Sequence, residues 1–217
     1  MTTAPPADTS AAAAEPDPGA TDWAALAAEL MSARRTVLPF RLGEPGPDPV
    51  QLRAILSVAA SAPDHRCLLP WRFITVPADR REALAEVFVQ ALLERDPAAE
   101  AHDLAKAREK GFRSPFLALL VVDETKGDAE IGLAERLISA GAAAQNVLLM
   151  ATALGYGSAL TAGQSVRSAA LHRFFGLGER EQAVCFLSIG TALSHGKTVV
   201  RPALADYVST LSPLGQG

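Results

Sequence analysis

The side chains that could perform catalysis are dispersed along this sequence of 217 residues. Its four histidines are spread over the chain, at His65, His102, His172 and His195. The two cysteines, Cys67 and Cys185, lie far apart and form no C-x-x-C pair, which disfavours a disulfide scaffold. No group of cysteines and histidines completes a four-ligand set of the kind that holds zinc, so we expect no metal-binding residues.

The motifs of several large enzyme classes are also missing. Gly155-Tyr156-Gly157 resembles part of a dinucleotide fingerprint, but a helix is expected before these glycines and a strand after them, the reverse of the Rossmann order. The sequence has no G-x-x-x-x-G-K-[ST] loop, no G-x-S-x-G elbow and no H-E-x-x-H pair. A zinc hydrolase and a serine hydrolase therefore have no support.

Composition favours one globular domain with a small-molecule partner. Hydrophobic residues make up 49% of the chain, and the formal net charge is −4. Proteins that bind nucleic acid without sequence preference normally carry a basic excess, so no nucleic-acid partner is expected. The first basic residue is Arg34, which indicates neither a signal peptide nor a transit peptide, and we expect a cytoplasmic protein.

The first twenty residues differ from the rest in composition. They are rich in Ala and Pro and contain no aromatic or basic residue, so they offer little apolar surface to bury. We predict that residues 1–20 form a disordered tail and that residues 21–217 form a single domain.

Residues 137–166 carry no charge. Polar residues and glycines interrupt this stretch and Ala dominates it, so no membrane span is expected. We predict a helix that ends near Gly155 and is buried on all sides. Because a single domain with few strands can shield only part of such a helix, a two-fold partner would cover the remainder.

Capping signals predict the other helices. Asp22 begins a helix that ends near Arg35, and Asp48-Pro49 begins a second one. Asp79 is predicted to cap a third helix, and Ser165 a short helix that closes at Gly176. The charged segment 98–110 is typical of a helix that faces solvent.

Apolar runs predict the strands. These are residues 73–76, the seven apolar residues 116–122, then 156–160 and 183–189. The run 116–122 is typical of a strand covered on both faces. Strands separated by long helical stretches, with no internal repeat, predict an α+β or α/β sandwich that is not doubly wound.

Five short motifs, in this order, give the sequence a resemblance to a known family. They are Arg34-Arg35-Thr36, Ala62-Pro63-Asp64-His65, Pro70-Trp71-Arg72-Phe73, Gly155-Tyr156-Gly157, and Phe186-Leu187-Ser188-Ile189-Gly190-Thr191. Their order and spacing resemble the nitroreductase family of flavoenzymes, in particular the subgroup with A-P-D-H and P-W-x-F, from about Trp23 to Tyr207.

The resemblance implies an α+β sandwich in which helices flank a mixed, mostly antiparallel sheet. It also implies a homodimer with shared FMN sites. The family passes hydride from NADH or NADPH through the flavin to a nitro compound, quinone or similar small-molecule acceptor, so no side chain need be catalytic. Two alternatives stay open: a flavin-binding protein that stores FMN or senses redox state, and another redox reaction in the same fold, such as flavin breakdown or dehalogenation.

The resemblance also assigns residues to the phosphate end of FMN. Arg34, Arg35 and Thr36 would hold phosphate and ribityl, although paired arginines can also simply complement a helix end. Arg201 is the expected basic residue near the C-terminus, with Lys197 as a substitute, although either can be a solvated charge.

Other site residues follow from the same resemblance. His65 would reach the flavin of the partner subunit, or serve only its own turn, and Ser61 occupies a place where relatives can carry a basic contact. Leu160, Thr161, Ala162 and Gly163 would line the isoalloxazine ring, where some relatives have W-R-S-G. The smaller, uncharged wall leaves the acceptor preference open, and residues 150–155 would lie near the nicotinamide.

Overall fold

The computed structural model describes residues 21–194 and 200–211 of the chain. The predicted tail, residues 1–20, lies outside the described residues, as do His195 and Lys197. No described helix has the length and hydropathy needed to cross a membrane.

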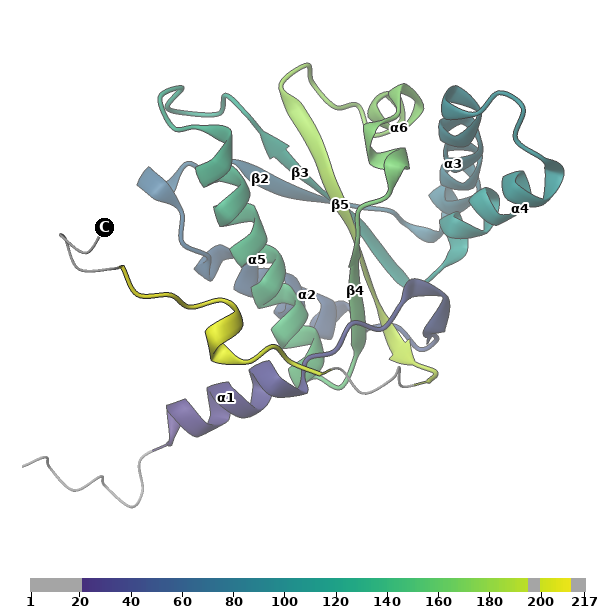
Figure 1. Cartoon of the computed structure of the whole chain (residues 1–217). Coiled ribbons are helices and arrows are strands. Elements are labelled where there is room, and N and C mark those ends of the chain that lie inside the picture. Colours follow the sequence, from purple (N-terminus) through teal and green to yellow (C-terminus); the bar gives the residue numbers. More distant parts are fainter. Residues whose placement is uncertain (1–20, 195–199, 212–217) are drawn as a thin grey trace, which may run out of the picture.

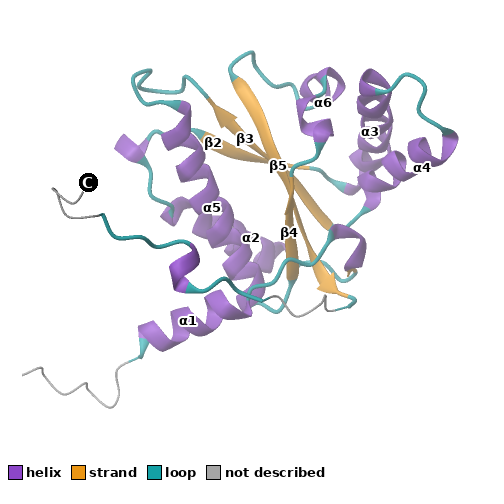
Figure 2. Cartoon of the chain, viewed as in Figure 1, coloured by secondary structure: helices purple, strands orange, loops and turns teal. Residues whose placement is uncertain are grey.

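The described chain forms one antiparallel sheet with helices on both faces (Figures 1 and 2). The sheet has five strands: β1 (Leu42–Gly43), β2 (Trp71–Thr75), β3 (Phe116–Asp123), β4 (Gly157–Thr161) and β5 (Glu181–Ala192). Their order is β1-β5-β3-β2, and β4 also pairs with β5. The helices are α1 (Trp23–Ala33), α2 (Pro49–Ser57), α3 (Arg81–Arg95), α4 (Ala101–Glu109), α5 (Leu133–Ala153) and α6 (Ala169–Phe174). The expected α+β sandwich is confirmed.

Two cores lie on the two faces of the sheet. Helices α2 and α5 cover one face, where Ile55, Val147 and Leu187 are buried together. Helices α3, α4 and α6 cover the other face, which buries Leu84 and Phe186 among others. Strand β3 lies between the cores with its residues 117–122 buried, so the prediction of a strand covered on both faces is confirmed.

Local signals explain two helix starts. The Asp22 side chain accepts a hydrogen bond from the Ala25 N–H (3.0 Å) at the start of α1. Asp48 forms a capping box with Gln51, and Pro49 occupies the first turn of α2. Each cap satisfies backbone N–H groups that the helix itself leaves free.

Two predicted caps are wrong, in both cases because a short 3-10 turn precedes the helix. Asp79 lies inside the turn Ala78–Arg80, and α3 begins after it at Arg81 with no side-chain cap. Ser165 lies inside the turn Gln164–Arg167. Helix α6 is capped instead by Ser168, whose hydroxyl accepts from the Leu171 N–H (3.2 Å).

The single chain buries only part of the helix that contains the uncharged stretch, so burial on all sides depends on the expected partner subunit and stays a prediction. Helix α5 begins at Leu133, before the uncharged stretch, and therefore contains the buried Arg136. Its outward face stays open, and the Ile138 side chain is 69% exposed. One subunit thus covers only the inward face of α5.

Candidate functional site

Three arginines meet where α1 ends. Arg34 follows the last turn of α1, Arg35 is next in sequence, and Arg201 donates from Nη2 to the Arg34 carbonyl oxygen (3.0 Å). Burial, reinforced by the positive charges of Arg201 and Arg35, lowers the pKa of Arg34 from its ordinary value. Within the described residues these three side chains form no ion pair with a carboxylate. Three positive charges that lie together in this way are suited to binding an anion.

The chain that leaves this arginine group runs beside β4. Thr36 forms a parallel bridge with Ser158, and the Val37 N–H donates to the Ser158 carbonyl oxygen (2.9 Å). Strand β4 then leads away toward Leu160 and the segment that ends at Gly163. At about 3.3 Å per residue, Ser158 and Ala162 are about 13 Å apart along the strand. The arginine group and the segment 160–163 thus lie at opposite ends of one strand.

Gly163 leaves open space in front of its backbone. A Cβ at this position would meet no atom within 4 Å, and the backbone φ of −94° is one that any residue can adopt. The glycine is therefore not required by the local conformation. The open backbone fits the close approach of a flat group.

A cavity of about 250 Å³ lies beside this segment, on the α3 side of the sheet. We call it the Lys110 cavity; its walls are mostly apolar, and its lining includes Leu38, Phe40, Phe88, Leu117, Phe186, Lys110, Arg113, Thr161, Gly163 and Ser188. The Ser188 hydroxyl is buried there and has no hydrogen-bond partner among the described residues. A buried hydroxyl without a protein partner is available to bond an ordered water or a polar ligand atom in the cavity.

Lys110 brings positive charge to this cavity. Burial, together with the charges of Arg113 and Arg95, lowers the pKa of Lys110 from its ordinary value. Arg113 is partly balanced by Glu109, whose carboxylate lies 3.6 Å away. The cavity is therefore suited to a ligand that carries negative charge or accepts hydrogen bonds.

A buried arginine fixes the segment that carries Lys110. The Arg81 guanidinium donates to the carbonyl oxygens of Val76 (3.1 Å), Gly111 (3.2 Å) and Pro115 (3.0 Å). Because Gly111 directly follows Lys110, these bonds hold the backbone on which the lysine stands. The Lys110 cavity is thus preorganised by the fold.

Sequence reasoning missed Lys110 and Ser188. Lys110 ends a charged segment that was expected to face solvent, yet it stands in a 3-10 turn after α4 and borders the cavity. Ser188 is the one hydroxyl in the apolar run of β5, and that signal could have marked it.

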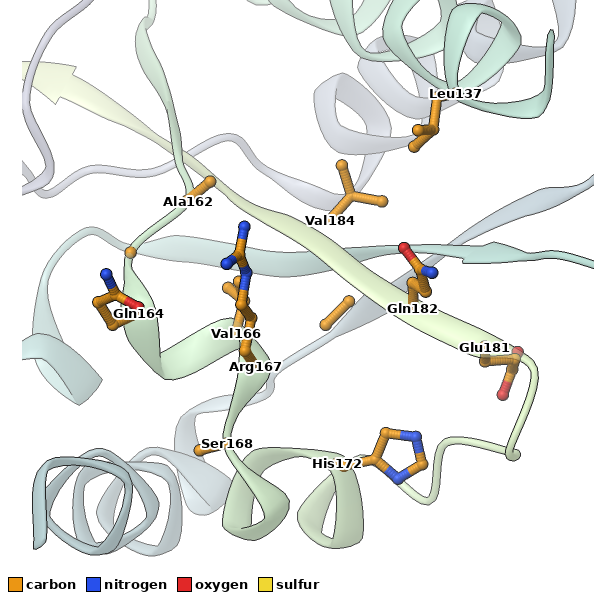
Figure 3. A pocket seen from close by; sticks show the side chains of 12 residues that line it. Leu137, Ala162, Gln164, Val166, Arg167, Ser168, His172, Glu181, Gln182 and Val184 are labelled. Atoms are coloured by element: carbon orange, nitrogen blue, oxygen red, sulfur yellow. The ribbon is translucent and has the colours of Figure 1, made fainter. Parts of the chain in front are cut away.

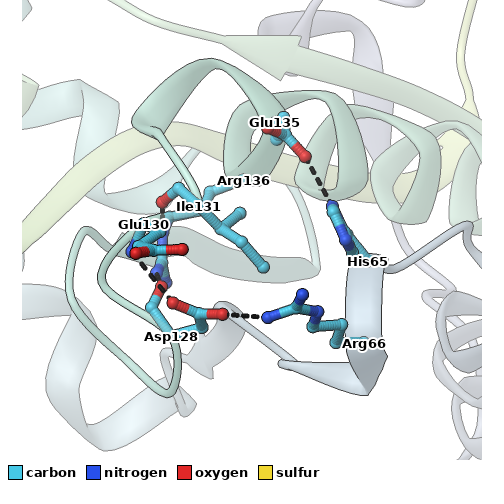
Figure 4. A network of polar contacts seen from close by, with 7 residues as sticks. All are labelled: His65, Arg66, Asp128, Glu130, Ile131, Glu135 and Arg136. Atoms are coloured by element: carbon cyan, nitrogen blue, oxygen red, sulfur yellow. Dashed lines mark hydrogen bonds and ion pairs between the residues drawn. The ribbon is translucent and has the colours of Figure 1, made fainter.

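His65 lies beside Glu135, near the start of α5 (Figure 4). Its Nδ1 lies 2.7 Å from Oε2 of Glu135, near the start of α5, whereas Leu30 of α1 and Met150 of α5 line a common cavity near the other end of that helix. At about 1.5 Å per residue, Glu135 and Met150 are about 22 Å apart along α5. The structure therefore does not bring His65 to the arginine group of its own subunit. Its role across a dimer interface stays a prediction.

The segment after His65 is tied to the loop that precedes α5. Arg66 pairs with Asp128 (Figure 4). Arg136 donates to the carbonyl oxygens of Ile131 (2.9 Å) and Asp128 (2.6 Å) in the same loop. These contacts hold the backbone next to His65 in place, and the His65 side chain is exposed there.

Ser61 lies neither with the arginine group nor beside His65. It borders a cavity of about 390 Å³ that is lined mainly by Leu30 of α1 and by Leu149 and Met150 of α5. The Ser61 side chain is exposed and makes no hydrogen bond among the described residues. Its expected contact with a cofactor stays untested.

Comparisons with known proteins agree on one family. The model of the nitroreductase family matches residues 31–191. YdjA of Escherichia coli (strain K12), whose name places it among the NAD(P)H nitroreductases, is 33% identical over 174 residues, which cover 80% of this chain and 92% of YdjA.

Solved structures share the fold at lower identity. A nitroreductase-like protein from Bacillus cereus aligns with a TM-score of 0.72 and 19% identity, covering 85% of this chain and 95% of that one. The FMN-dependent nitroreductase NfnB from Mycobacterium smegmatis, solved with NADPH, aligns with a TM-score of 0.68 and 20% identity, over 88% of this chain and 100% of that one.

Proposed function

The chain belongs to the nitroreductase family, and from that premise we propose that it is an FMN-dependent oxidoreductase that uses NADH or NADPH. The electrons would pass to a nitro compound, a quinone or a similar small acceptor. The observation that carries the proposal is the convergence of Arg34, Arg35 and Arg201 at one end of β4, with an open backbone at its other end.

The arginine group fits the phosphate of FMN. A phosphate monoester carries about −1.5 to −2 charges near neutral pH, and guanidinium groups bind it through paired, charge-assisted hydrogen bonds. The like charges around Arg34 destabilise one another until such an anion is present, and the Thr36 hydroxyl stands next in sequence as a further donor. Arg34, Arg35, Thr36 and Arg201 would therefore hold the phosphate and ribityl parts.

The other end of β4 fits the ring. Leu160, Thr161, Ala162 and Gly163 would lie along it, and the Ser188 hydroxyl and Lys110 would offer hydrogen bonds and positive charge from the adjoining cavity. When bound, FMN supplies the two-electron chemistry by accepting a hydride and passing electrons to the acceptor. The protein's task is to position the reactants and to keep the Lys110 charge fixed where negative charge can develop.

We also propose that the active form is a homodimer with shared sites. Apolar side chains on α1 and on the outward face of α5 are exposed in the single chain, with Trp23 73%, Ile138 69% and Met31 58% exposed. Large apolar surfaces of this kind mark contacts between proteins. A two-fold partner would cover them and could bring His65 of one subunit to the flavin held by the other.

Two measurements test the proposed function. The purified protein, supplied with FMN, should retain about one FMN per subunit and show the flavin absorbance. Under anaerobic conditions that absorbance should bleach when NADPH or NADH is added and should return when a nitroaromatic or quinone follows. Protein that retains no FMN would contradict the proposal, and retained flavin that neither dinucleotide reduces would leave only flavin binding.

A further inference from the structure

A third and larger cavity adjoins the proposed site at Ala162 and Gly163. It has a volume of about 640 Å³, within the range of about 300–1,000 Å³ usual for ligand sites. We call it the Arg167 cavity; Figure 3 shows the side chains that line it, among them Ala162, Gln164, Arg167, His172, Gln182 and Val184. Its position continues the site beyond the end of β4, away from the arginine group at Arg34.

The cavity exists because β4 ends before β5 does. The last pair between these strands joins Thr161 to Phe186, whereas β3 continues along the other edge of β5 to Glu181. Among the described residues, the edge of residues 182–185 that faces away from β3 has no strand partner. Its backbone groups are free to form hydrogen bonds with a ligand.

The charge in this cavity comes from Arg167. Glu181 is the acid among the lining residues, and its carboxylate accepts two hydrogen bonds from Arg72 (2.8 and 3.0 Å). The Gly178 N–H donates to the same carboxylate (3.0 Å). Arg167 forms no ion pair within the described part of the chain, and its guanidinium extends into the cavity toward Ala162 (Figure 3).

We propose that the Arg167 cavity binds the anionic arm of the compound that reacts beside Gly163, and that Arg167 supplies the charged hydrogen bonds. The ligand chemistry is a phosphate or carboxylate group in a compound that also contains an aromatic or heteroaromatic ring. Two sources have this chemistry: the 2′-phosphate of NADPH, and an acceptor that carries an acid group. The inference rests on the proposed function, because that function places the reacting compound at Gly163.

Binding without turnover tests the donor as the source. Adenosine 2′,5′-bisphosphate and 5′-AMP are titrated by calorimetry into the FMN-loaded protein and into an Arg167→Gln variant. A lost charge-assisted contact should weaken binding of the bisphosphate about ten- to a hundredfold and leave 5′-AMP little changed. Arg167→Lys should recover part of the affinity.

The matched control is Arg173→Gln. Arg173 belongs to α6, close in sequence, and is exposed as Arg167 is, but it lies 3.6 Å from Glu94 and outside the cavity. This control should bind both nucleotides as the original chain does. An equal loss in both variants would overturn the assignment to Arg167.

A second arm tests the acceptor. The KM values of 4-nitrobenzoate and of the uncharged 4-nitrobenzyl alcohol are compared in the original chain and in Arg167→Gln. If only the KM of the carboxylate rises about tenfold or more, the acceptor is the source of the anion. If neither the bisphosphate nor the carboxylate responds to Arg167→Gln, the inference is overturned.

This failure differs from failure of the proposed function. The FMN content and the anaerobic bleaching of the flavin are measured on the same samples. If the protein holds FMN that NADPH or NADH reduces, but Arg167→Gln changes neither the affinity for the bisphosphate nor the KM of the carboxylate, only this inference is contradicted. If the protein retains no FMN, the proposed function is contradicted.

Discussion

Two groups of arginines in this molecule differ in where their hydrogen bonds go. Arg81 and Arg136 are buried, and each guanidinium donates to backbone carbonyls of its own subunit. Arg34, Arg35 and Arg201 lie together, and no carboxylate among the described residues pairs with them. The first group completes the fold, and the second group is the one we propose to bind a ligand.

Helix α5 shows the same contrast for apolar side chains. Its inward residues, such as Ala143 and Val147, are fully buried against the sheet. Its outward residues Leu137 and Ile138 are exposed. Groups that the subunit leaves unsatisfied therefore mark where a cofactor or a second subunit is expected, and substitutions in the two classes should have different effects.

The largest loss of stability is expected from Arg136→Met. Four backbone carbonyls, those of Ile131, Asp123, Lys126 and Asp128, would lose their donor inside the protein. Each buried acceptor that is left without a donor costs about 1–3 kcal/mol. Chemical denaturation of the FMN-free protein should show this loss, while Arg34→Met should cost little in the same assay. Equal losses would remove the distinction between the two groups.

The next effect is expected at the outward face of α5. Ile138→Lys would place a charge where a partner subunit is proposed, and burial of an Ile side chain contributes about 1.5–3 kcal/mol for each subunit. Sedimentation should show a homodimer for the original chain and a weaker one for the variant. The dimer should dissociate less readily with FMN bound, because dimerisation and FMN binding stabilise each other by mass action.

A control on the opposite face of the sheet sharpens this experiment. Ala105→Lys adds the same charge to the exposed side of α4 and should leave the dimer intact. A monomer that retains its full flavin content would contradict the shared site.

Arg34→Ala should weaken FMN binding. A charge-assisted hydrogen bond contributes about 1.5–3 kcal/mol, so the dissociation constant should rise about ten- to a hundredfold. The stability of the FMN-free protein should hold, because the substitution also relieves repulsion from Arg35 and Arg201. Fluorescence titration with FMN measures the change, with the exposed Arg53→Ala on α2 as control. Unchanged affinity would leave Arg34 as a charge that complements the helix end.

Local patterns allowed much of the fold to be predicted. Asp22 and Asp48 act within one helical turn, so their side chains cap α1 and α2 as the sequence indicates. The caps at Asp79 and Ser165 failed because a 3-10 turn and an α-helix can begin with the same residue types. Sequence periodicity does not show whether a 3-10 turn or an α-helix comes first along the chain.

The candidate site was less predictable. Arg34, Arg35 and Thr36 are adjacent in sequence and could be read directly, but Ser188 and Lys110 come to line one cavity only in the folded chain. The partner of His65, if it is another subunit, lies beyond any single chain. Sequence thus indicates groups that act locally, and the structure is needed for those that meet across elements.

The smallest effect is expected from Arg72→Gln, and it depends on pH. The hydrogen bonds from Arg72 hold the pKa of Glu181 below its ordinary value. A lowered pKa in the folded state stabilises the protein above the unfolded value of about 4.3, and that stabilisation is lost as the pH falls through the folded pKa. Because Arg72 is 49% exposed, solvent screens the pair and its contribution is at most about 1 kcal/mol. Denaturation at pH 7 should therefore show Arg72→Gln slightly less stable than the original chain, and the difference should shrink as the pH is lowered from about 4.3 through the folded pKa of Glu181. A difference that stays constant over the whole acid series would mean that Arg72 acts through packing of its side chain and not through the Glu181 charge.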